Sequence, residues 1–115
     1  MNIAEKPVEQ QRSIYRVDSF TVPLAARDEF LKRLVVIRDF LQTQPGCLFN
    51  RIAESAAENG VVRMMTIVEW RDQSAVQNAR ASAAAYYERT GFDPGEFMEK
   101  LGITPDFGLF RDTAV

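Results

Sequence analysis

The run from Val61 to Trp70 (VVRMMTIVEW) is apolar on both of its alternating faces. One face carries two valines, a methionine and the tryptophan; the other carries a valine, a methionine and an isoleucine, interrupted by Arg63 and Glu69. The helices of a chain this small cover one face of a sheet, so the second apolar face needs another cover. The most economical cover is a second copy of the chain, and the pattern therefore predicts a homodimer.

Three further elements are predicted in the first half of the chain. The segment 13–22 is rich in β-branched and aromatic residues and turns at Pro23, which is typical of a strand. Apolar residues at spacings of three and four then predict a helix that ends before Pro45; its stripe consists of Ala26, Phe30, Leu34, Ile37 and Leu41. A second strand, 47–54, forms a hairpin with 61–70, because Asn59-Gly60 is a reversal signal.

The second half of the chain predicts two helices and a last strand. Asp72 is placed to cap the first helix, whose predicted buried side holds Ala75, Val76, Ala79, Ala83, Tyr86 and Tyr87. Asp93 is placed to cap a short helix over 94–101, and the segment 105–111 predicts the last strand. The order β-α-β-β-α-(α)-β predicts an α+β fold of the ferredoxin-like split βαβ type, with an antiparallel sheet. We expect one domain over residues 13–115, after a flexible N-terminal arm over residues 1–12.

Composition limits the class of protein. The chain has 115 residues, 46% of them apolar and 26% charged, with a net charge of −2, as expected for one soluble globular domain. No cluster of lysine and arginine predicts binding to nucleic acid. No apolar stretch approaches the roughly 18 residues that a membrane-spanning helix needs, and the N-terminus does not resemble a signal peptide. We expect a cytoplasmic protein, and the single cysteine, Cys47, fits a reducing compartment.

The chain contains no histidine. Its absence excludes nucleophilic sites of the Ser-His-Asp and Cys-His types, most zinc sites and a proximal histidine for haem. Glycine-rich loops that bind nucleotides are also missing. We therefore expect neither a metal nor a cofactor, and no general base is evident from the sequence.

Aromatic residues near the end of the third strand indicate a candidate binding site. Trp70 ends the strand, and Tyr86 and Tyr87 lie on the helix that follows. Core packing explains such rings, and so does a cavity for a flat apolar ligand. In the second case the candidate polar contacts are Asn50, Thr66, Asn78 and Arg89.

Five short motifs carry a resemblance to a known family: YRVDSFTVP, RDEFLKRL, QPGC, TIVEWRDQSAV and YYERTGFDP. Together they resemble the antibiotic biosynthesis monooxygenase domain, a dimeric α+β barrel, over residues 14–111. The resemblance implies that Trp70 lines the pocket. It also places Thr66 where an asparagine in the family often contacts substrate or oxygen. The haem-degrading branch of the family does not fit a chain without histidine.

The resemblance implies an oxygenase that acts without a cofactor on a phenolic or quinol-type aromatic small molecule. The substrate would lose a proton in a dry pocket, and its anion would reduce oxygen. Arg89 would then stabilise the anion, and the ring oxygens would contact Tyr86, Tyr87, Asn50 or Thr66. Two alternatives stay open at this point: a non-catalytic module that binds or senses a small molecule in the same cavity, and a purely structural dimer.

Overall fold

A computed structural model describes residues 12–113 of the chain. The elements are β1 (Ile14–Pro23), the 3₁₀ turn η1 (Leu24–Ala26), α2 (Arg27–Gln42), β2 (Cys47–Glu54), β3 (Val61–Trp70), α3 (Gln73–Thr90), α4 (Pro94–Leu101) and β4 (Thr104–Arg111). This order confirms the predicted ferredoxin-like fold. The predicted N-terminal arm lies outside the described residues, apart from Arg12.

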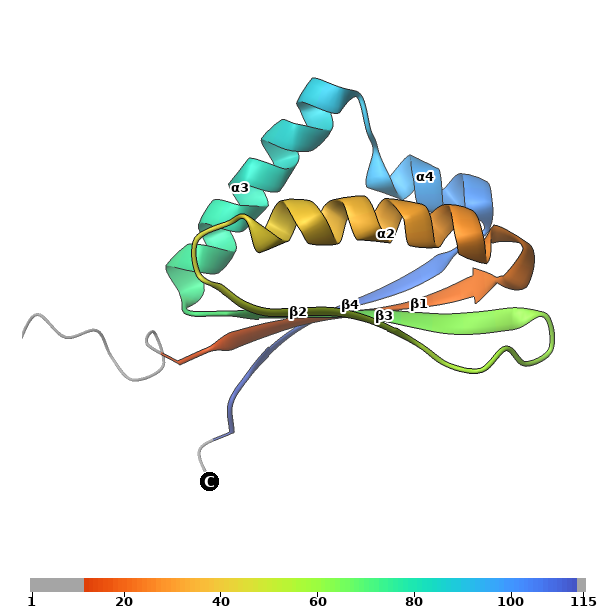
Figure 1. Cartoon of the computed structure of the whole chain (residues 1–115), viewed down its shortest axis with the longest axis horizontal. Coiled ribbons are helices and arrows are strands. Elements are labelled where there is room, and N and C mark those ends of the chain that lie inside the picture. The colour runs from red at the N-terminus through yellow and green to blue at the C-terminus, as the bar shows by residue number, and fades with distance from the viewer. Residues whose placement is uncertain (1–11, 114–115) are drawn as a thin grey trace, which may run out of the picture.

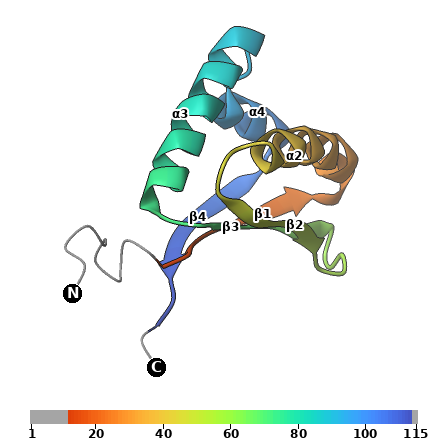
Figure 2. The same ribbon diagram turned by 60° about the vertical axis from the view of Figure 1, so that its left-hand side comes forward.

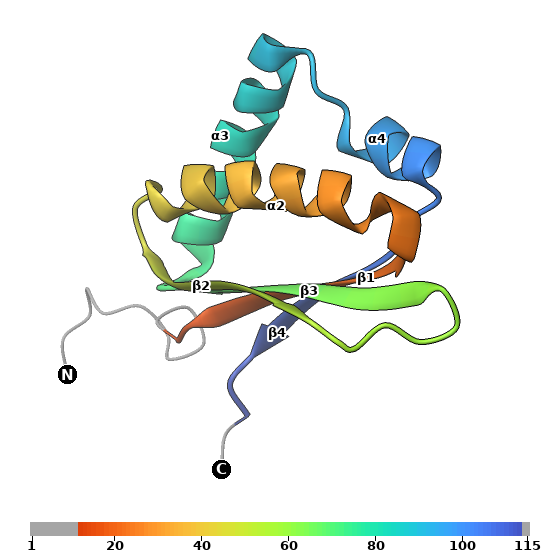
Figure 3. The ribbon, with the colours of Figure 1, turned by 45° about the vertical axis from the view of Figure 1, so that its right-hand side comes forward.

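The four strands form one antiparallel sheet in the order β2-β3-β1-β4. All three α-helices lie on the same side of this sheet, as the three ribbon views show (Figures 1, 2 and 3). Among the described residues, no helix covers the opposite face. No helix of residues 12–113 has the length and apolar character needed to cross a membrane.

Local sequence signals set the ends of several elements. Asn59 and Gly60 both have positive φ, 54° and 77°, so the predicted reversal between β2 and β3 is confirmed. Asp72 caps α3 by accepting a hydrogen bond from the backbone N–H of Ala75 at 2.9 Å. Asp93 caps α4 by accepting one from the backbone N–H of Glu96 at 3.1 Å. Each cap satisfies a backbone donor that the first helical turn leaves unpaired.

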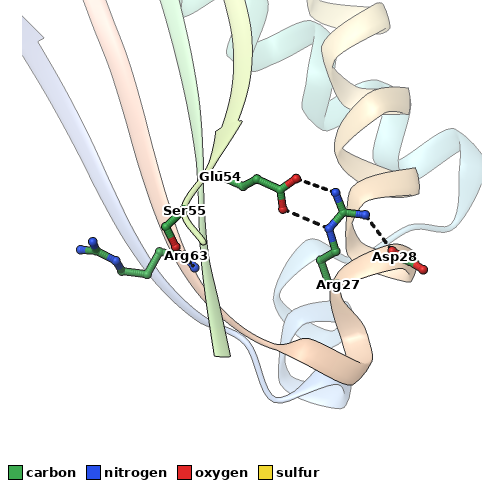
Figure 4. A network of polar contacts seen from close by, with 5 residues as sticks. All are labelled: Arg27, Asp28, Glu54, Ser55 and Arg63. Atoms are coloured by element: carbon green, nitrogen blue, oxygen red, sulfur yellow. Dashed lines mark hydrogen bonds and ion pairs between the residues drawn. The ribbon is translucent and has the colours of Figure 1, made fainter. Parts of the chain in front are cut away.

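The N-terminal end of α2 is attached to the end of β2 by an ion pair. The guanidinium of Arg27 donates two hydrogen bonds to the carboxylate of Glu54, at 2.6 and 3.0 Å, and a third to Asp28 at 2.7 Å (Figure 4). Beside this pair, the hydroxyl of Ser55 accepts a hydrogen bond from the backbone N–H of Arg63 at 3.0 Å. These contacts hold α2 over β2, where it forms one side of the site described below.

Helix α3 lies near the sheet only at its N-terminal end. Its buried residues are Ala75, Val76 and Ala79, all in the first two turns. Beyond them the helix rises away from the sheet, as Figure 2 shows. The prediction of one buried side along the whole helix was therefore wrong for its C-terminal half, where Ala83, Tyr86 and Tyr87 are half-buried. The spacing of apolar residues along a helix indicates which side of the helix faces the protein. It does not indicate how far each turn lies from the sheet.

Candidate functional site

The hydrophobic core is divided into two clusters that lie at opposite ends of the sheet. One cluster is built on Phe20, Val22, Phe30, Leu34, Val62 and Met64. The other is built on Ile14, Val68, Trp70, Ala75, Val76 and Ala79. Between them the same sheet face carries polar side chains. A break of this kind in a small core is the place where a ligand cavity is expected.

The polar residues between the clusters follow from strand register. Asp18 of β1 is directly opposite Thr66 of β3, and Arg16 of β1 is directly opposite Val68 of β3. On its other side Val68 is opposite Asn50 of β2. Because side chains of directly opposed residues point to the same face of a sheet, all of them point toward the helices.

These strands form the floor of a cavity of about 390 Å³, which is in the size range of small-molecule sites. Its remaining walls come from α2, from α3, from the segment between α3 and α4, and from α4 itself. Trp70, which is only 3% exposed, lies in the wall at one end. At the edge strand β4 the wall includes Phe107, which is 54% exposed. Arg80 and Ala84, which line the cavity from α3, are exposed as well.

Four of the seven site residues predicted from the sequence line this cavity: Trp70, Thr66, Asn50 and Tyr87. The other three do not. Asn78 is exposed on α3. Tyr86 stacks on Phe40 of α2, with ring centroids 4.6 Å apart, and Cζ of Arg89 lies over the ring of Tyr86, 5.5 Å from its centroid. Asn78 lies on the solvent side of α3, and Tyr86 faces Phe40 of α2 instead of the cavity.

Asn50 has a structural bond as well as a position in the cavity wall. It is 5% exposed, and its Nδ2 donates a hydrogen bond to the backbone carbonyl of Arg38 at 2.9 Å. This bond connects β2 to α2 across the edge of the cavity. Burying an amide without such a partner would cost about 1–3 kcal/mol, so the bond also explains how a polar residue is accommodated there.

Tyr87 brings a phenolic hydroxyl into the cavity wall. Burial raises its pKa above the ordinary tyrosine value, although the nearby positive charges of Arg33 and Arg16 act in the opposite direction. The hydroxyl is therefore neutral at physiological pH and can donate a hydrogen bond. Arg33 and Arg16 line the same cavity as this hydroxyl.

The sequence analysis missed the charged residues of the cavity: Asp18, Arg16, Arg33, Arg38 and Arg80. Asp18 accepts a hydrogen bond from Nε of Arg16 at 2.6 Å, and its side chain is 15% exposed. One signal was available, because Arg16 and Asp18 alternate with buried Ile14 and Phe20 on the same face of β1. Two charges on a strand face that is otherwise apolar indicate a polar site or a ligand cavity.

Two kinds of reactive centre are not supported by the geometry. Within residues 12–113 no group of three or more Asp, Glu, Cys or His side chains is arranged to hold a metal ion. Burial raises the pKa of the Cys47 thiol, which lowers the fraction of reactive thiolate. The polar groups that line the cavity are the arginines, Asp18 and the hydroxyl and amide side chains.

A comparison with protein families finds one match. The profile of the family described as antibiotic biosynthesis monooxygenase matches residues 13–86, which is more than half of the chain. The protein belongs to this family. No curated protein sequence matches it.

Solved structures with the same fold are numerous but distant in sequence. One is a variant of SnoaB from Streptomyces nogalater, a cofactor-independent oxygenase, with 22% identity and a TM-score of 0.65 over 90% of this chain and 96% of that one. Another, from Shewanella loihica, is provisionally described as a monooxygenase; it has 18% identity and a TM-score of 0.67 over 90% and 97%. A conserved protein from Methanosarcina mazei has 13% identity and a TM-score of 0.67 over 91% and 97%. At these identities the likeness establishes the fold alone.

Proposed function

We propose that this protein is a cofactor-independent monooxygenase that acts on a phenolic or quinol-type aromatic small molecule in the cavity between the two core clusters. The observation that carries the proposal is the polar floor, with Asp18, Arg16 and Thr66 set between two apolar clusters. Membership of the antibiotic biosynthesis monooxygenase family gives this cavity a reaction class. SnoaB, which shares the fold, is a cofactor-independent oxygenase.

The walls of the cavity suit a flat aromatic substrate. Trp70 supplies a large ring at one end, and Phe92 and Phe97, whose ring centroids are 5.3 Å apart, supply two more near α4. Apolar walls remove water from the substrate and strengthen electrostatic interactions inside the site. Thr66 and Tyr87 then provide hydroxyl groups that bond the ring oxygens.

Asp18 is the only carboxylate among the described residues that line the cavity, and we assign it the role of proton acceptor. It takes the proton of the phenol, and the guanidinium of Arg16, 2.6 Å away, keeps the carboxylate in place. The resulting phenolate is rich in electrons and is stabilised by the arginines of the cavity. This assignment supplies the general base that the sequence alone did not reveal.

The reaction balances with dioxygen as the sole oxidant. A ring C–H para to the phenol is replaced by a carbonyl, the phenol itself becomes the second carbonyl, and the ring supplies four electrons to dioxygen. One oxygen atom enters the new carbonyl and the other leaves as water, which takes both hydrogens lost from the substrate. The products are a quinone and water.

Oxygen consumption tests the proposal directly. Purified protein treated with a chelator and freed of flavin is mixed with a panel of phenols, hydroquinones and anthrones in an oxygen electrode. The expected result is uptake above the buffer rate, with one dioxygen consumed for each quinone formed. Saturable binding without uptake would contradict an oxygenase and favour the binding or sensing module. Absence of both signals across the panel would leave only the structural dimer.

We also propose that the protein is a homodimer formed through the helix-free face of the sheet. This face carries Phe49, Met65, Ile67, Val17 and Phe110, which come from all four strands. Phe49 is 40% exposed and Phe110 is 55% exposed in the single chain. Exposed large apolar side chains gathered on one sheet face are unusual on a soluble monomer, and here Arg51 and Glu69 lie among them. A two-fold interface of more than roughly 1,200 Å² would cover it.

A further inference from the structure

The charge of the cavity differs from the charge of the whole chain. The chain has a net charge of −2. The cavity walls contain four arginines and one aspartate, an excess of three positive charges (4 − 1 = 3). Several arginines around a cavity with apolar walls attract anions and raise the local concentration of an anionic ligand. A neutral phenol does not require such a surplus, and neither does a single phenolate.

Two of the four arginines already have a carboxylate partner. Arg16 pairs with Asp18 at 2.6 Å, and Arg38 pairs with Asp39 at 3.2 Å. For Arg33 of α2, the structure of residues 12–113 contains no carboxylate within ion-pairing distance. Its guanidinium is therefore a positive charge in the cavity wall that has no carboxylate partner among the described residues.

Aromatic rings hold Arg33 in a defined orientation. Its Cζ lies 3.8 Å from the ring centroid of Phe92 and 6.0 Å from that of Phe97. Contacts with the ring faces occupy the flat side of a guanidinium and leave its N–H groups, which point outward in its plane, available for hydrogen bonds. This edge of a guanidinium matches the two oxygens of a carboxylate and forms two parallel hydrogen bonds with it.

A second donor lies beside Arg33. The ring of Tyr87 is 5.5 Å from the ring of Phe92, centroid to centroid, so its phenol belongs to the same part of the wall. Its hydroxyl is protonated at physiological pH for the reason given above. Arg33 and Tyr87 together provide a cation and a neutral donor at one place in the cavity, and Trp70 lies in a different part of the wall, on β3.

We propose that the substrates of this cavity are hydroxylated aromatic carboxylic acids, and that Arg33 and Tyr87 bind the carboxylate. The aromatic rings extend from that point into the space between Trp70 and the polar floor, where Asp18 meets the phenol. This inference rests on the proposed function for the location of the ligand. It adds the chemical group that the substrate carries in addition to its phenol.

Calorimetric binding of two matched probes tests the inference without relying on turnover. 5-Hydroxy-1-naphthoate and its methyl ester share the same rings and a phenol on the ring remote from the carboxyl group, but only the first carries the negative charge. The acid should bind the protein at least about tenfold more tightly than the ester, because charge-assisted bidentate hydrogen bonds are roughly twice as strong as neutral ones. Equal affinities, or a preference for the ester, would overturn the inference.

Variants locate the carboxylate site. Arg33→Met keeps an unbranched apolar side chain against Phe92 and should abolish the preference for the acid while leaving ester binding within about twofold. Arg33→Lys keeps the positive charge but loses the planar pair of N–H donors, and it should retain only part of the preference for the acid. Arg89→Met is the matched control, since Arg89 also lies on a tyrosine ring but outside the cavity. An unchanged preference in Arg33→Met, or an equal loss in Arg89→Met, would contradict the assignment.

The two proposals fail in different ways. If the acid binds preferentially through Arg33 but no oxygen is consumed, the carboxylate site stands and the oxygenase proposal falls. If oxygen is consumed equally well with neutral phenols and the acid has no advantage in binding, the oxygenase proposal stands and the carboxylate site falls. Circular dichroism of each variant confirms that the comparison is made between folded proteins.

Discussion

Asp18 on β1 and Thr66 on β3 are directly opposite each other in the antiparallel ladder, and both point to the face covered by helices. Toward one end of β1 the next residue on that face is Phe20, which belongs to one core cluster; on β3, Val68 begins the other cluster. This polar pair therefore marks the boundary at which the core opens into a cavity. Much of the proposed chemistry depends on it.

Replacing Asp18 tests its role as proton acceptor. Asp18→Asn keeps the shape of the side chain and an acceptor for Arg16 but removes the basic carboxylate. Oxygen consumption should fall by about 10²-fold or more, the usual contribution of a positioned base, while ligand affinity changes less. Asp39→Asn is the control, because Asp39 also pairs with an arginine but lies on the exposed side of α2. Full activity in Asp18→Asn would exclude the carboxylate from the reaction.

Trp70 should report binding, because it is the single tryptophan of the chain and lies in the cavity wall. A phenol or hydroquinone that occupies the cavity should quench its fluorescence saturably. Trp70→Phe preserves an aromatic ring but removes the indole N–H, and we expect a loss of about 1 kcal/mol in binding if that group bonds the ligand. Because Trp70→Phe has no tryptophan fluorescence, its ligand affinity is measured by calorimetry. Quenching that rises linearly with ligand concentration and does not saturate would indicate collisional quenching and would contradict binding in the cavity.

Tyr87 should make the folded state less stable at high pH. Burial raises its pKa above 10.0, so the folded chain keeps this proton while the unfolded chain loses it. The stabilisation is complete below pH 10 and is lost as the pH rises through the raised pKa. Urea unfolding measured above pH 10 should show a smaller decline in Tyr87→Phe than in the natural chain. Tyr15→Phe is a necessary comparison, since a hydrogen bond with Asp112 raises the pKa of Tyr15 as well.

Gly46 is required where β2 begins beside α3. Its φ is +86°, and a Cβ added there would lie 2.6 Å from Cβ of Ala75. Its carbonyl also accepts a hydrogen bond from the backbone N–H of Arg71 at 2.8 Å, which holds the start of α3 against the sheet. Gly46→Ala should cost about 2–4 kcal/mol of unfolding free energy, from left-handed backbone strain and overpacking together.

Gly60→Ala separates the two causes. Gly60 has a similar φ of +77°, but nothing lies within 4 Å of the added Cβ. The strain alone should cost about 1–2 kcal/mol. Denaturant unfolding of the two variants gives the comparison, and equal costs would mean that the contact with Ala75 contributes nothing.

A charge on the helix-free face should prevent the proposed dimer. Ile67 lies in β3 near the middle of that face, opposite Val17 of β1 and Arg51 of β2. Ile67→Lys should halve the mass measured by light scattering at micromolar concentration, because a buried unpaired charge is costly. Val36→Lys places the same charge at a residue of α2 that is 41% exposed, on the other side of the sheet, and should leave the mass unchanged. A natural chain that scatters as a monomer would contradict the dimer.

The elements and their order were predictable from local signals in the sequence. Period-two and helical alternation, the Asn59-Gly60 reversal and the caps at Asp72 and Asp93 are local signals, and each acts within a few residues of the chain. The topology followed from them, because few arrangements bury the apolar faces of four strands and their helices. Trp70 and Thr66 were also accessible, since their positions depend only on strand alternation and family resemblance.

Tertiary structure alone decided which helix residues reach the cavity. Tyr86 and Tyr87 are neighbours in the sequence, yet Tyr86 stacks on Phe40 and Tyr87 lines the cavity. Successive residues of a helix point about 100° apart, so the position of α3 against α2 decides which of the two reaches the cavity. The angle of a helix is set by its contacts along the whole length, including the close approach of Gly46 to Ala75, and these are not encoded in its own periodicity. Arg33 of α2 lines the cavity through the packing of its own helix, whereas Arg89 of α3 does not line it. Packing between elements that are distant in the sequence therefore decides which charged residues line the cavity.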